Sequence, residues 1–117
     1  MSGVRCNWIV AGGMHYPVIV MNRRTRRWFN AQEMNPAARQ RLGVPWKSCC
    51  DNGDVFKTRF RVADDRSDQW QYLKDGQWRT IPPDIVKEED TPDHLPVLFI
   101  NKHTGAELCF FVGKGGL

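Results

Sequence analysis

Long hydrophobic runs are missing from this sequence of 117 residues. The most apolar runs, 16–21 and 95–100, are far shorter than the roughly 20 residues that a membrane-spanning helix needs. Residues 1–10 carry one charge and precede Gly12-Gly13, which is not the form of a signal peptide. We therefore expect no membrane partner and a cytoplasmic location.

The spacings that preset a metal site are also missing. The four cysteines and three histidines form no C-x-x-C or H-x-x-x-H pattern, so we expect no metal and no cofactor. The cysteines do not resemble a disulfide framework either, because Cys49 and Cys50 are adjacent and a domain of this size needs no cross-links. The expectation is that all four thiols, Cys6 and Cys109 included, are reduced.

Catalytic patterns are weak, and we assign no catalytic residue. Cys49 or Cys50 could act as a nucleophile with a histidine as its base, but only spatial proximity defines such a pair. A metal-dependent nuclease or other hydrolase is a further, weaker alternative. It would gather a divalent ion from the acidic residues of one Pro-rich loop, which are Asp84, Glu88, Glu89, Asp90 and Asp93.

What the sequence does have is an uneven distribution of charge. Residues 1–61 carry 11 basic and 3 acidic side chains, a net +8, and residues 62–117 carry 6 and 10, a net −4, which together give the overall +4. The basic residues concentrate at 23–27 and at alternate positions from 57 to 61. This asymmetry indicates an electrostatic partner or a contact between the two halves.

Length and composition predict a single domain over residues 1–117. Hydrophobic residues make up 41% and charged residues 26%, which is typical of a globular chain with one core. No internal repeat divides the sequence. Five tryptophans are unusual in a chain of this length, and we interpret most of them as large core anchors.

In the first half, residues 7–10 and 16–21 have the β-branched composition of strands, and the short segment between them favours antiparallel pairing. We expect a turn at 22–27, and a third strand that begins at Trp28 and Phe29. Pro36 at a first helical position and Gly43 beyond the last predict a short helix over 36–42.

In the second half, residues 55–62 alternate between apolar and basic side chains and predict one strand. Residues 69–73 and 77–81 form a predicted hairpin, whose three-residue loop would place Tyr72 opposite Trp78 and Gln71 opposite Arg79. An acidic loop follows over 84–96. Residues 97–101 and 107–112 are apolar at nearly every position, which predicts strands at the sheet centre or covered on both faces.

These elements indicate an α+β fold, a mostly antiparallel curved sheet of about six or seven strands with one short helix. The function that requires the fewest coincidences is binding. We expect a small non-enzymatic binding or regulatory module that engages an acidic protein partner through a basic face flanked by aromatic residues. A nucleic-acid-binding protein that uses the same face is the alternative. A homodimer is possible through unpaired edge strands.

The candidate binding residues come from the two basic segments and the hairpin. Side chains at 23–27 would form one exposed positive patch with those at 57–61. The candidates are Arg23, Arg24, Arg26, Arg27, Trp28, Lys57, Arg59, Arg61 and Arg79.

Overall fold

The strands of this protein form two sheets rather than one. The computed structural model describes residues 7–10, 19–20, 23–51, 53–63, 66–92 and 94–113. Its elements are β1 (Asn7–Val10), β2 (Ile19–Val20), α1 (Arg23–Asn30), α2 (Pro36–Leu42), β3 (Gly53–Lys57), β4 (Phe60–Ala63), β5 (Arg66–Lys74), β6 (Gln77–Thr80), the 3-10 helix η1 (Pro83–Ile85), β7 (Val86–Lys87), β8 (Val97–Asn101) and β9 (Glu107–Phe111). Among these residues, a six-stranded sheet has the order β2-β1-β3-β8-β9-β7 and a three-stranded sheet the order β4-β5-β6.

The α+β class and the mostly antiparallel pairing are confirmed, and the single curved sheet is wrong. Neighbouring strands pair antiparallel except for β1 with β3 and β7 with β9, which are parallel. Strands β1, β3, β8 and β9 have four or five residues each, and the two-residue strands β2 and β7 lie at the edges. No helix in the described ranges is long and apolar enough to cross a membrane.

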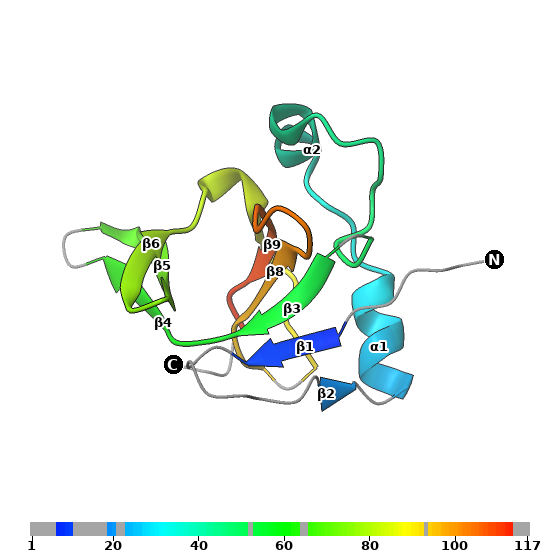
Figure 1. Ribbon diagram of the computed structural model, residues 1–117, viewed down its shortest axis with the longest axis horizontal. Helices are drawn as coiled ribbons and strands as arrows, with labels where there is room; N and C mark the ends of the chain where they lie inside the picture. Colours follow the sequence, from blue (N-terminus) through cyan, green and yellow to red (C-terminus); the bar gives the residue numbers. More distant parts are fainter. Residues whose placement is uncertain are drawn as a thin grey trace.

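Strands β8 and β9 are apolar at nearly every position because both faces of the large sheet are covered. On one face, the rings of Phe99 and Phe111 contact α1 through Phe29 and Trp28. On the other face, Phe110 contacts the rings of β4 and β5 at centroid distances of 5.2 and 5.5 Å. Figure 1 shows the large sheet between α1 and the three-stranded sheet. The prediction that these two strands are buried is confirmed.

The strand expected over 55–62 is interrupted, which is why there are two sheets. Strand β3 ends at Lys57 and β4 begins at Phe60. Between them, the Thr58 hydroxyl donates to the carbonyl oxygen of Leu73 over 2.6 Å, and the Leu73 amide donates to the carbonyl oxygen of Arg59 over 3.0 Å. The chain therefore leaves the large sheet with its polar groups satisfied by β5, and continues as the edge strand of the small sheet.

The turn expected at 22–27 and the strand expected from Trp28 are wrong, because residues 23–30 form helix α1. Arginine favours helices, and no Gly or Pro interrupts the segment. The helix brings Phe29 into the core, where it is 1% exposed. This packing outweighs the mutual repulsion of the arginines, which is worth only a few tenths of a kcal/mol per pair.

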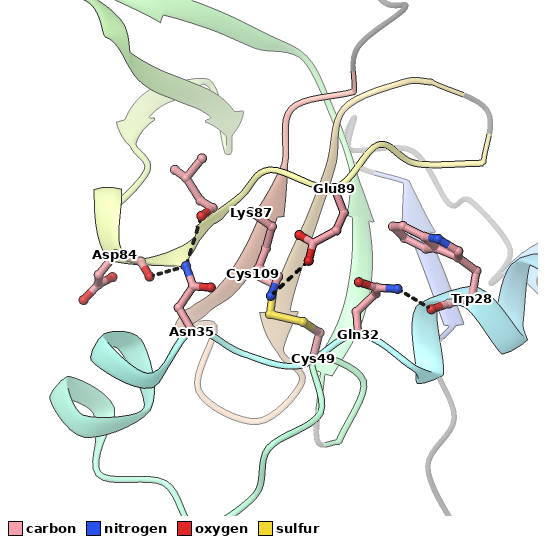
Figure 2. A network of polar contacts seen from close by, with 9 residues as sticks. Trp28, Gln32, Asn35, Cys49, Asp84, Lys87, Glu89 and Cys109 are labelled. Carbon is pink, nitrogen blue, oxygen red and sulfur yellow. Dashed lines mark hydrogen bonds and ion pairs between the residues drawn. A yellow bond between two sulfur atoms is a disulfide. The ribbon is translucent and has the colours of Figure 1, made fainter.

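Helix α2 has the bounds that the sequence predicts, with Gly43 in the left-handed conformation at its end (φ 65°). Asn35 precedes the helix but does not cap it through its side chain. Its side-chain amide instead donates to the carbonyl oxygens of Asp84 and Val86, at 2.9 and 3.0 Å (Figure 2). One amide thus connects the start of α2 to the segment that leads into β7.

The register of the β5–β6 hairpin differs by one residue from the expected one. Leu73 pairs with Trp78, and Tyr72 pairs with Arg79. The connection is a two-residue turn in which Asp75 (φ 53°) and Gly76 (φ 77°) both have positive φ, as a type I′ turn requires. Since side chains alternate between faces, the shift moves Trp78 to the face opposite Tyr72 and Trp70.

The expectation of reduced thiols is wrong for the described cysteines. Cys49 and Cys109 form a disulfide with a Cα–Cα distance of 5.9 Å, and Cys50 is also disulfide-bonded. Cys6 lies outside the described residues. The Cys49–Cys109 bond joins the loop after α2 to β9, beside the Asn35 contacts (Figure 2). Sequence spacing missed it because the fold, not a local motif, brings residues 60 positions apart together.

The Tyr72 hydroxyl provides a pH-dependent contact between the two sheets. It is buried and donates to Oε2 of Glu107 over 2.5 Å. Burial raises the pKa of Tyr72 well above its usual range, and the carboxylate of Glu107 adds to this effect. The pKa of Tyr72 in the folded protein exceeds the value of about 10 in the unfolded chain. The stability that the protonated hydroxyl contributes is therefore fully present below pH 10 and is lost as the pH rises above it.

We therefore expect Tyr72→Phe to make the stability of the protein less sensitive to alkaline pH. At neutral pH the variant should lose about 1–3 kcal/mol, because it removes a buried hydrogen bond to a charged group. Above pH 10 the difference from the unmodified protein should shrink. Urea unfolding followed by tryptophan fluorescence, across neutral and alkaline pH, measures both effects. A constant difference at every pH would contradict this account of Tyr72.

Candidate binding surface

The basic candidates do not form one patch, because they lie on different elements. In Figure 1, α1 and the three-stranded sheet lie toward opposite ends of the long axis, with the large sheet between them. The molecule extends 45 Å along this axis. Arg24 and Arg27 are therefore separated from Arg59 and Arg61, and the charge of the first half is divided between two places.

The α1 group offers exposed charge without an exposed ring. Arg24 and Arg27 are exposed, and the side chains of Arg23 and Arg26 lie outside the described part of the chain. The half-buried ring of Trp28 packs edge-on against Phe29 and Phe111, at centroid distances of 5.0 and 5.2 Å. This contact explains Trp28 as an anchor of the helix.

The most organised constellation lies on the outer face of the three-stranded sheet. The Cζ atom of Arg61, on β4, lies 4.1 Å from the ring centroid of Trp78, on β6. The Nε of the same guanidinium donates to Oε1 of Gln71, on β5, over 2.7 Å. The Arg61 side chain thus crosses the central strand and is fixed by both neighbours. The two terminal nitrogens of Arg61 donate no hydrogen bond to any residue that the structure describes.

Two further arginines extend this constellation. Arg59 is exposed and lies two residues before Arg61, immediately ahead of β4. Arg79 is exposed on β6 at the open edge of the sheet, on the face opposite Trp78, since it pairs with Tyr72. Its charge lowers the pKa of Tyr72, against the larger effects of burial and Glu107. We call the residues Arg59, Arg61, Gln71, Trp78 and Arg79 the arginine surface.

Within the described ranges, the three arginines of this surface form no ion pair. Other basic residues do form ion pairs, and Arg41 is one of them. Its guanidinium makes two hydrogen bonds to the carboxylate of Asp84, at 2.5 and 2.9 Å. Lys87 likewise lies 3.9 Å from Glu89. Two acidic residues of the second half, Asp84 and Glu89, therefore pair with Arg41 of α2 and Lys87 of β7.

Lys57 is separate from this surface. It is the last residue of β3 in the large sheet and is half-buried. The predicted alternation of 57, 59 and 61 on one strand ends where β3 and β4 part. Any pairing of the arginines with Asp64 and Asp65 lies outside the described residues.

The described tryptophan rings are already in contact with other side chains. Trp28 and Trp70 contact core phenylalanines, and Trp46 packs against the core with its Nε1 buried. Trp78 carries Arg61 over its ring. Binding of single strands by stacking needs free aromatic faces, and these four rings offer few.

The residues considered for catalysis are dispersed. Cys49 and Cys50 are disulfide-bonded, so neither is available as a nucleophile. Nδ1 of His94 contacts the Asp90 carboxylate, and this pair is exposed. Across the described segments, no three His, Cys, Asp or Glu side chains are grouped so that they could hold a metal ion. Asp93 lies outside the described residues.

Sequence reasoning missed Trp78 and Gln71 as partners of Arg61. The predicted register paired Trp78 with Tyr72 and Arg79 with Gln71, each one position away from the observed pairing. The Asp75-Gly76 pair could have indicated the correct register, because Asp-Gly between two apolar strands favours a two-residue hairpin turn. A two-residue turn gives the observed pairing directly.

No protein-family model matches this chain, and no curated protein or solved structure matches it either.

Proposed function

We propose that this protein is a small binding module that engages an acidic protein partner through the arginine surface. The observation that carries the proposal is the fixed position of Arg61, stacked on Trp78 and hydrogen-bonded to Gln71. A guanidinium that is already immobilised loses less conformational entropy when it binds a carboxylate. Its planar array of donors suits two parallel hydrogen bonds to one carboxylate.

A protein partner suits this surface better than a nucleic acid. Arginine and tryptophan are the side chains that most often dominate binding energy at protein interfaces. Nucleic-acid binding would benefit from a continuous basic track and free rings, whereas the basic residues are divided between two ends of the molecule. Nucleic-acid binding is therefore the second candidate function. A homodimer is a further proposal, which is tested below.

The disulfide supports a location other than the one expected from the sequence. Disulfides persist in oxidising compartments and are rare in the cytoplasm. The Cys49–Cys109 bond is fully buried, as both residues are 0% exposed. We therefore propose that the protein functions in an oxidising compartment, where its partner would also be found.

The test is a fluorescence-anisotropy titration with a fluorescein-labelled peptide pool rich in Asp and Glu. Single- and double-stranded oligonucleotides serve as competing probes. We expect the peptides to bind, and Arg61→Gln to weaken this binding about tenfold, the loss of one well-placed charged contact. Arg41→Gln is the matched control, because Arg41 is also exposed but is paired with Asp84. It should leave peptide affinity unchanged.

Two results would overturn the proposal. One is submicromolar binding of oligonucleotides that is lost in Arg61→Gln, which would put the nucleic-acid alternative first. The other is equal loss of peptide binding in Arg61→Gln and Arg41→Gln, which would show that net charge rather than this surface is recognised.

A further inference from the structure

Strand β6 is the open edge of the small sheet beside Arg61. It pairs with β5 alone, and residues 77, 79 and 80 are exposed. The Ile81 amide donates to the carbonyl oxygen of Trp70 over 2.8 Å, so Ile81 and Trp70 are a hydrogen-bonded pair. In an antiparallel ladder such pairs alternate with pairs that exchange no hydrogen bonds. The backbone of Arg79 therefore exchanges hydrogen bonds with Tyr72, whereas the backbone N–H and C=O groups of Trp78 and Thr80 point away from the sheet.

The outward edge therefore offers two amide donors and two carbonyl acceptors, from Trp78 and Thr80. None of these four groups has a hydrogen-bond partner within the described chain. An exposed strand edge of this kind is a template for one further strand. The charge beside it indicates which kind of strand fits.

Both faces of such an added strand would meet an arginine. A residue opposite Trp78 would share its face with the Arg61 guanidinium, which lies over the Trp78 ring. A residue opposite Arg79 would lie on the other face and directly beside that side chain. Two neighbouring acidic residues in an extended segment could therefore pair with Arg61 and Arg79 together.

We propose that the acidic partner is an extended segment with two neighbouring Asp or Glu residues, which adds to β6 as a fourth strand. This inference rests on the proposed function and specifies how the partner binds. Main-chain hydrogen bonds to Trp78 and Thr80 supply affinity, and the two carboxylates select the segment. A second copy of this chain does not suit the edge, because β6 against β6 would bring like charges together at Arg61 and Arg79.

The probe is a fluorescein-labelled peptide in which a central Glu-Glu pair is flanked by alternating Thr and Val. Two matched peptides carry N-methyl groups on alternate backbone nitrogens, one set on the odd residues and one on the even residues. Each keeps both carboxylates but loses the amide donors of one edge. We expect one of the two to bind no longer within the measurable range and the other to bind as the parent does.

On the protein, Thr80→Pro tests the same hydrogen bonds. Proline is tolerated at an edge position whose N–H faces away from the sheet. Thr80 is such a position, because its N–H donates no hydrogen bond to Gln71, the residue with which it pairs. The variant should weaken parent-peptide binding threefold to tenfold, about the net value of one hydrogen bond. Thr80→Ala keeps the N–H and should bind as the unmodified protein does. Thermal unfolding of both variants verifies that they are folded.

The outcomes separate this inference from the proposed function. If both N-methylated peptides bind like the parent while Arg61→Gln still weakens binding, strand addition is wrong and the arginine surface stands. If the parent peptide binds neither the protein nor its variants, and the acidic pool also fails to bind, the proposed function is wrong. Concentration-dependent dimerisation that is abolished by Thr80→Pro would show that a second copy occupies the edge, and would overturn the inference.

Discussion

Replacing both Cys49 and Cys109 by alanine should lower the free energy of unfolding by about 4 kcal/mol. The bond joins positions 60 residues apart, and closing a loop of that length removes much of the conformational entropy of the unfolded chain. Urea unfolding under non-reducing conditions, followed by the fluorescence of the tryptophans, gives the size of the loss. A loss of this size would be a large share of the stability of a small domain.

A reducing agent supplies the control for this prediction. With the bond of the unmodified protein reduced, most of the difference from the double variant should disappear, because only the packing of two thiols then separates the two proteins. Peptide mapping without reduction should recover a fragment that joins Cys49 to Cys109. Since Cys50 is also disulfide-bonded, titration of the denatured protein should find no more than one free thiol. Four free thiols would contradict the assignment.

Phe110→Ala should cost about 3–5 kcal/mol and loosen the small sheet in particular. Phe110 is fully buried, and its ring contacts Phe60 on β4 and Trp70 on β5. Removing the ring leaves a cavity between the two sheets at the contact that holds the arginine surface in place. Hydrogen exchange should show lost protection in β4 and β5, and binding of the acidic peptide should weaken as well.

Phe111→Ala is the matched control, because it removes the same side chain from the next residue on the opposite face. Phe111 is also fully buried, but its ring contacts Trp28 and Phe99. We expect a comparable loss of stability, with exchange protection lost in α1 rather than in β4 and β5. If the two variants lost protection in the same segments, the layered arrangement of the core would be wrong.

The sequence by itself determined those elements whose limits are marked by local chemistry. Pro36 and Gly43 set the ends of α2, because one residue fixes the first φ angle of a helix and the other adopts the left-handed conformation beyond it. The apolar runs of β8 and β9 predicted strands covered on both faces. The basic surplus of residues 1–61 is likewise a property of the sequence alone.

Only the tertiary structure decided how these elements combine. Helix α1 forms because Trp28 and Phe29 find partners on the large sheet, and no local pattern in 23–30 contains those partners. The Cys49–Cys109 bond likewise depends on the position of β9 beside the loop after α2. A one-residue difference in a turn moved Trp78 to the face of Arg61 and assembled the candidate site. Charge patterning could therefore indicate arginines without locating the surface that they form. The position of that surface depends on contacts between distant residues and on the two-residue period of strands.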